Sequence, residues 1–141
     1  MPQLTAEDIL AADDLERTKE YVPEWAPKGA EKPAEFYVWI KTLTGLERDK
    51  YEAELVKLKG PKAVGLDLDN VRARLLQRVL IGDDGKPLFS KDQVIRLGMK
   101  SAAVIDRLWA IARKLNGLSE DDVAELVGNS EAETAADSHS G

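Results

Sequence analysis

The sequence predicts a small α+β protein that is mainly α-helical, with about five or six helices and an N-terminal two-stranded β-hairpin. Helix-capping patterns recur along the chain, apolar residues repeat at helical spacing between them, and one early stretch alternates as strands do. With 141 residues, 43% of them apolar, the chain can bury one core without disulfides or metal. We expect one domain over residues 1–127 and a disordered acidic tail over 128–141, where no apolar period is found.

The clearest helix signal lies between Ser101 and Gly117. At about 100° per residue, its apolar side chains share one side and its charged side chains share the other. Ser101 is placed to cap the first turn, and Gly117 can adopt the left-handed conformation that ends a helix. We expect a helix over 102–116 with Leu108 at the centre of its buried side. Trp109 lies at the edge of that side, where it either borders the core or belongs to a contact surface.

Three other segments share one pattern of helix start. Thr5, Ser90 and Ser119 each follow an apolar residue, and a second apolar residue lies five positions after the first. This arrangement provides a capping side chain and a hydrophobic staple. We expect a helix to begin at each segment, and the first of them to end near Ala12.

Two more helices are expected in the middle of the chain. Thr44 begins a capping box, and the helix after it should reach about Leu58. The next helix should begin at Asp67 and Asp69, where the helix dipole favours negative charge, and end near Leu80. The first has a narrow apolar stripe of Tyr51, Leu55 and Leu58, and the second should turn inward Val71, Leu75, Leu76 and Val79.

The early strand-like segments cover 17–25 and 35–42, where β-prone residues are frequent. They would form a hairpin whose connection is rich in proline and charge, which predicts an exposed and mobile loop. Because side chains alternate along a strand, Phe36, Val38 and Ile40 should face the core. Tyr37 and Trp39 then share the other face with Lys41, where aromatic side chains are available to a partner.

The composition excludes several kinds of catalytic and metal site. Cysteine is absent and His139 is the only histidine, so a thiolate nucleophile, a Ser/His/Asp triad and a zinc site built on these residues are excluded. Asp83 and Asp84 belong to an Asp-Gly turn expected within 81–89, and the oxygen-ligand spacing of a calcium loop is missing. The sequence contains no phosphate-binding loop and no nucleophile elbow. We therefore expect a binding protein without catalytic residues, cofactor or metal.

The charge and hydropathy of the chain restrict its partners further. A net charge of −6 and a pI near 4.9 disfavour nucleic-acid binding, which needs a basic face. No apolar run approaches the roughly 20 residues that span a bilayer, and the first residues lack a secretory pattern. We expect a soluble cytoplasmic protein.

Four stretches of the chain are similar in sequence to one known protein family. They are residues 4–15 (LTAEDILAADDL), 43–49 (LTGLERD), 83–89 (DDGKPLF) and 115–123 (LNGLSEDDV). Together with the order of the elements, they resemble the tail assembly chaperones of long-tailed phages, particularly phages of actinobacteria. The stretches cover nearly the whole chain, and none of them encodes chemistry.

This resemblance implies a mainly helical protein of the infected bacterial cytoplasm that is absent from the mature virion. Such chaperones keep the long tape measure protein soluble and bring tail tube subunits to it. Many are also made in a longer form by ribosomal frameshifting, and this chain resembles the short form. The resemblance implies that the long form is the one that binds the tail tube protein. The implied partners are these two proteins and further copies of the chain, with no nucleic acid and no membrane. On this interpretation, the partner-binding residues are Tyr37, Trp39 and Trp109.

Two other classes of function stay open at this point. A structural tail or head-completion protein would remain in the virion, so mass spectrometry of purified particles would separate it from a chaperone. A helical nucleic-acid-binding regulator would use the helices over 67–80 and 101–116 as a helix-turn-helix pair. Their connection is much longer than the three or four residues of that motif, and the acidity of the chain also argues against it.

Overall fold

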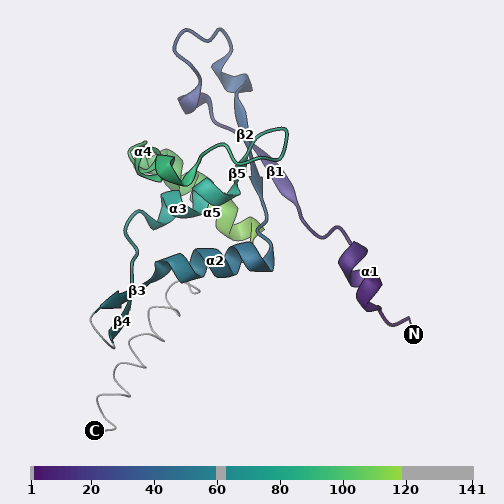
Figure 1. Cartoon of the computed structure of the whole chain (residues 1–141). Coiled ribbons are helices and arrows are strands. Elements are labelled where there is room, and N and C mark those ends of the chain that lie inside the picture. The colour runs from purple at the N-terminus through teal and green to yellow at the C-terminus, as the bar shows by residue number, and fades with distance from the viewer. Residues whose placement is uncertain (1, 60–62, 119–141) are drawn as a thin grey trace.

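The structure is a computed structural model that describes residues 2–59 and 63–118 (Figure 1). The predicted class is confirmed, because an antiparallel sheet near the N-terminus is followed mainly by helices. In chain order, the elements are α1 (Ala6–Ala11), β1 (Arg17–Tyr21), the 3₁₀ helices η1 (Pro23–Trp25) and η2 (Pro33–Glu35), β2 (Tyr37–Lys41), α2 (Gly45–Leu55), β3 (Val56–Lys59), β4 (Ala63–Leu66), α3 (Val71–Val79), β5 (Leu80–Ile81), η3 (Lys91–Gln93), α4 (Val94–Gly98) and α5 (Ala102–Leu115).

The predicted hairpin forms the larger part of a three-stranded sheet. β1 and β2 pair antiparallel, with Arg17 opposite Lys41 and Tyr21 opposite Tyr37. β5 pairs antiparallel with the other edge of β2, so the strand order is β1-β2-β5. The expected turn after β5 also forms, closed by a hydrogen bond of 2.9 Å from the N–H of Gly82 to the carbonyl of Lys86.

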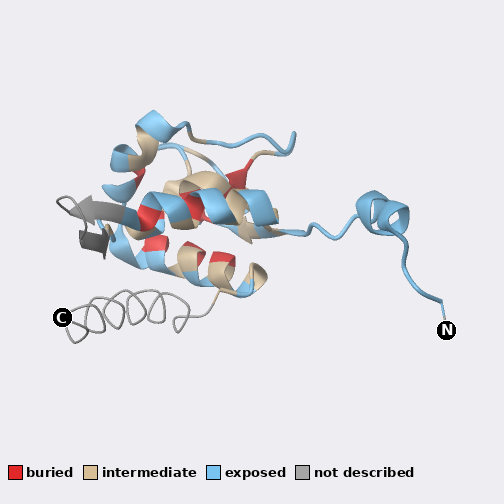
Figure 2. Ribbon diagram, turned by 60° about the horizontal axis from the view of Figure 1, so that its bottom comes forward, coloured by how far each residue is buried: buried red, intermediate tan, exposed pale blue. Residues whose placement is uncertain are grey.

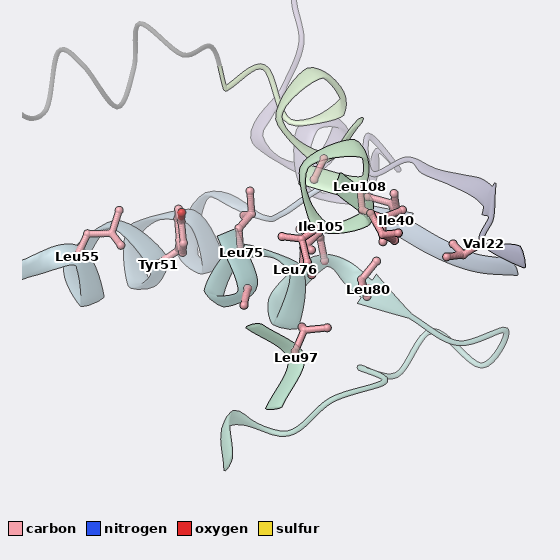
Figure 3. Packing of buried hydrophobic residues seen from close by; sticks show 14 residues of the cluster. Val22, Ile40, Tyr51, Leu55, Leu75, Leu76, Leu80, Leu97, Ile105 and Leu108 are labelled. Atoms are coloured by element: carbon pink, nitrogen blue, oxygen red, sulfur yellow. The ribbon is translucent and has the colours of Figure 1, made fainter. Parts of the chain in front are cut away.

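The core fills the space between this sheet and the helices. Ile40 of β2, Leu80 of β5, Leu76 of α3 and Leu108 of α5 are all fully buried, and Figure 3 shows them converging from these four elements. On α2, Tyr51 and Leu55 are also buried and extend the core along α3. The buried set of α5 is Val104, Ile105, Leu108 and Ala112. The prediction for this helix and for its central residue is therefore confirmed.

Two side chains connect α5 to the sheet region, one from its middle and one from its C-terminal cap. Arg107 forms a two-pronged ion pair with Glu24, and its Nε lies 3.6 Å from Glu20. At the C-terminal cap, the Asn116 side chain accepts from the N–H of Leu43 at 2.6 Å and donates to the carbonyl of Lys41 at 3.2 Å. These contacts join α5 to β1, η1 and β2.

Two helix boundaries differ from the prediction. α2 ends at Leu55, and Leu58 belongs to β3, which pairs with β4 in a separate two-stranded sheet. α3 begins at Val71 rather than at Asp67, because the backbone of Asn70 is left-handed with φ at +54°. Asp67 lies outside the helix, where its carboxylate pairs with Arg74 at 2.9 Å.

Two smaller expectations are also wrong. Phe36 precedes β2 and is 43% exposed, so it does not join Val38 and Ile40 on the core side. Ser101 provides no side-chain cap; its backbone carbonyl accepts from the N–H of Ile105 instead. Gly117 does adopt the expected left-handed conformation, with φ at +65°.

Asn70 and Gly98 meet where α3 begins and α4 ends. The side-chain N–H of Asn70 donates to the carbonyl of Val94 at 3.0 Å. A Cβ atom at position 98 would fall on the Asn70 amide group, so the close approach requires glycine. The interlock fixes α4 against α3.

Helix α1 lies apart from this body. Its capping box is complete, since Thr5 Oγ1 accepts from the N–H of Asp8 at 3.1 Å and the Asp8 carboxylate accepts from the N–H of Thr5 at 2.9 Å. Every residue from 2 to 17 is nevertheless exposed. Figures 1 and 2 show α1 at the end of a linker, away from the other helices.

Several expectations lie outside the described residues. These are the helix start at Ser119, the domain boundary at 127 and the acidic tail over 128–141.

Candidate interaction surface

The outer face of the β1–β2 hairpin collects aromatic and cationic side chains. The register sets Lys19 beside Trp39 and Tyr21 beside Tyr37, and strand alternation turns these residues away from the core. Arg17, Lys19, Tyr21 and Tyr37 are exposed and Trp39 is half-buried. We call Arg17, Lys19, Tyr21, Tyr37, Trp39 and the neighbouring Asp83 the aromatic face.

The rings of this face contact one another edge to face, and cationic side chains lie over two of them. Ring centroids of Tyr21 and Tyr37, and of Tyr37 and Trp39, are 6.1 Å apart at steep angles of 67° and 84°. Lys19 Nζ lies 4.1 Å from the centre of the Tyr37 ring, and Arg17 Cζ lies 4.1 Å from that of Trp39. Both arrangements are favourable for aromatic quadrupoles, so the rings are held in place before a partner arrives.

Asp83, in the turn after β5, supplies the polar contacts of the aromatic face. Trp39 Nε1 donates to its carboxylate at 2.7 Å, and the Tyr37 hydroxyl donates to both oxygens at 2.9 and 3.0 Å. These donors, Trp39 first, hold the pKa of Asp83 below its usual value, and the carboxylate in turn raises the pKa of Tyr37. The polar atoms of both rings are thus satisfied, and a partner can cover their carbon surface without breaking a hydrogen bond.

The structure does not bring Trp109 to this face. Arg72 of α3 and Arg113 of α5 both lie over its ring, with Cζ atoms 4.6 and 3.9 Å from its centre. Arg72 also pairs with Asp106 at 3.0 Å. Trp109 is partly buried against the core among the helices. Of the three predicted residues, Tyr37 and Trp39 therefore share a surface, and Trp109 lies elsewhere.

A pocket lies between α4 and η1. It has a volume of about 180 Å³ and a mostly apolar surface, and its lining includes two cationic side chains. Its lining residues are Trp25, Phe89, Gln93, Arg96, Leu97 and Lys100, which we call the α4 pocket. Sequence reasoning missed this pocket, because its lining residues come from η1, from η3 and the residue before Ser90, and from α4 and the segment after it.

The described residues offer no arrangement suited to metal chemistry. Across 2–59 and 63–118, no three His, Cys, Asp or Glu side chains are grouped so that they could hold a metal ion. None of the helices in this part of the chain combines the length and the apolar character needed to cross a membrane. What this part of the chain does present is the aromatic face and the α4 pocket, which are both suited to binding another molecule.

Comparisons with protein-family models, with curated proteins and with solved structures found no match for this chain.

Proposed function

We propose that this protein is a tail assembly chaperone of a long-tailed phage, which binds the tape measure protein and keeps it soluble. In this role it also helps to recruit tail tube subunits, acts in the cytoplasm of the infected bacterium and leaves before the virion is complete. The proposal joins the sequence resemblance to one observation, the aromatic face. Tyr37 and Trp39 present the carbon surface of their rings, and the polar atoms of both side chains already donate hydrogen bonds to Asp83.

The physical requirement of such a client supports the proposal. A tape measure protein is a long helical chain whose apolar stripes lack partners until the tail tube closes around it, so a transient binder must cover them. Aromatic side chains supply large contact area and commonly dominate the energy of an interface. Weak contacts repeated along one client add up through effective concentration, so no single contact has to be tight.

The test is a comparison of Trp39→Ala with Leu46→Ala, both co-expressed with the tape measure protein of the same phage. Leu46 is 66% exposed on α2 and lies outside the aromatic face, so it controls for the loss of any exposed apolar side chain. We expect Trp39→Ala to weaken binding by more than about 1 kcal/mol. Its client should precipitate while the variant itself stays folded, and Leu46→Ala should behave as the parent protein does.

Two outcomes would contradict the assignment of Trp39. A folded Trp39→Ala protein that keeps its client soluble would exclude the aromatic face as the client surface. A variant that is itself unfolded would mean that Trp39 acts as part of the core. Detection of the protein in purified virions by mass spectrometry would reject the chaperone function itself and favour a structural tail or head-completion protein.

A further inference from the structure

The N-terminal arm, residues 2–16, carries apolar side chains that nothing in the described structure buries. Leu10 is 85% exposed and Ile9 is 58% exposed on α1, and Leu4 and Leu15 flank the helix at 69% and 51%. A helix of six residues is far below the roughly 12 to 15 at which isolated helices become stable in water. An exposed apolar group on a short and isolated helix is typical of a segment that binds another surface.

The charge of the arm restricts that surface. Five carboxylates lie between residues 2 and 16, and the first basic residue of the chain is Arg17. The five are Glu7, Asp8, Asp13, Asp14 and Glu16. A complementary surface must therefore combine an apolar hollow with positive charge.

The α4 pocket has this combination. Its apolar walls include Trp25, Phe89 and Leu97, and the exposed cations Arg96 and Lys100 also line it. Its volume of about 180 Å³ is comparable to that of a cavity of about 150 Å³ that holds a benzene-sized group. One residue before each of the two cations, Ile95 and Met99 are 76% and 82% exposed, so the apolar surface continues outside the pocket.

The arm is not placed to enter the pocket of its own copy. Glu16 is held at the start of β1, because its N–H donates to Thr42 Oγ1 at 2.9 Å and its carbonyl accepts from the N–H of Thr42 at 2.8 Å. The linker from Ala11 to Glu16 spans at most about 18 Å, so α1 folded back along β1 would reach only about as far as the end of that strand, which is roughly 17 Å long. Trp25 lies a further four residues beyond the end of β1. Figures 1 and 2 both show α1 and α4 on opposite sides of the molecule.

We propose that the N-terminal arm of one copy of this protein docks in the α4 pocket of a second copy. Leu10 and Ile9 supply the apolar contact, and the arm carboxylates face Arg96 and Lys100. The contact joins two different surfaces, so each added copy leaves one arm and one pocket free, and copies join head to tail into rows or rings. This interface is distinct from the aromatic face and does not depend on the proposed client.

Sedimentation velocity of the full chain over rising concentration tests the interface. The average mass of the parent protein should rise with concentration, and added salt should weaken the association, because it screens the charge contacts. Leu10→Asp in the arm and the double variant Arg96→Glu/Lys100→Glu at the pocket should each weaken self-association at least tenfold. All three positions are exposed, so folding should be preserved. Leu46→Asp, at an exposed site on α2, is the matched control and should associate as the parent protein does.

Mixing the two variants tests the head-to-tail arrangement itself. The Leu10→Asp protein keeps an intact pocket, and the pocket variant keeps an intact arm. An equimolar mixture should therefore form a dimer that stops at two copies, although each variant alone is monomeric.

Three results would overturn the proposal. The first is a parent protein that stays monomeric at hundreds of micromolar, which would also be the result if the arm folded onto its own copy. The second is a Leu10→Asp protein that associates as strongly as the parent. The third is a mixture of the two variants that forms no dimer. None of these results bears on whether Trp39 binds the tape measure protein, so the two proposals fail separately.

Discussion

Helices α1 and α5 both have marked boundaries and carry apolar side chains, but they are stabilised in opposite ways. α1 has a complete capping box and no buried residue, whereas α5 has no side-chain cap and buries four residues. A cap contributes about 1 kcal/mol, and full burial of one aliphatic side chain contributes about 1.5 to 3 kcal/mol. Capping therefore determines where a helix begins, and burial determines whether the helix belongs to the folded body.

The largest expected difference between the two helices is in the cost of removing a leucine. Leu108→Ala in α5 should lower the free energy of unfolding by about 2 to 5 kcal/mol, because it removes a fully buried side chain and leaves a cavity. Leu10→Ala in α1 is the matched control and should change it by less than about 0.5 kcal/mol. Denaturant unfolding of both variants measures the difference. Equal losses of unfolding free energy at the two positions would show that α1 and α5 are not stabilised in different ways.

Burial should also make the core sensitive to alkaline pH in a way that α1 is not. Tyr51 is only 5% exposed, and its burial raises the pKa of its hydroxyl from 10 to about 12. The unfolded chain then loses this proton near pH 10, and the folded chain retains it to about pH 12. The resulting stabilisation is complete below pH 10 and is lost as pH rises through 12, a change of about 2 to 3 kcal/mol.

Tyr51→Phe isolates this contribution. Denaturant unfolding of parent and variant between pH 8 and 12 should show a steeper loss of stability for the parent protein. Parallel pH profiles would mean that Tyr51 titrates as an exposed tyrosine does.

The smallest expected difference concerns the caps themselves. Thr44 caps α2, which carries the buried Tyr51 and Leu55, so Thr44→Ala should lower the free energy of unfolding by about 0.5 to 2 kcal/mol. Thr5→Ala removes an equivalent cap from α1 but should leave global stability unchanged and only increase amide hydrogen exchange within Ala6–Ala11. A global loss of stability in Thr5→Ala would show that α1 contributes to the folded body.

The elements that the sequence predicts well are those in which the apolar pattern repeats over several turns or alternates simply along a strand. α5 extends over nearly four turns, so its apolar side is sampled repeatedly, and the β1–β2 hairpin follows from alternation. β5 has only two residues and continues directly from α3, which leaves no period to recognise. Leu58 follows Tyr51 and Leu55 at helical spacing, and this local pattern concealed the strand β3.

Within the aromatic face, the contacts that follow from a local sequence period could be predicted, and those that depend on the tertiary fold could not. Alternation along β2 places Tyr37 and Trp39 together, so the sequence predicts that pair. Asp83 lies 46 and 44 residues away from them, and its contact depends on how β5 pairs with β2. The sequence groups Trp109 with the pair because it is aromatic and borders an apolar arc, but the side on which a helix packs is decided by the tertiary fold.

The contact between Asn70 and Gly98 has a consequence for evolution. Because a Cβ atom at 98 would occupy the place of the Asn70 amide, position 98 must stay glycine while Asn70 is kept. A descendant with alanine at 98 would need a shorter residue at 70, and glycine there would also tolerate the left-handed backbone. Diverged relatives that keep asparagine at 70 should therefore keep glycine at 98, and a larger residue at 98 should occur only with a smaller residue at 70.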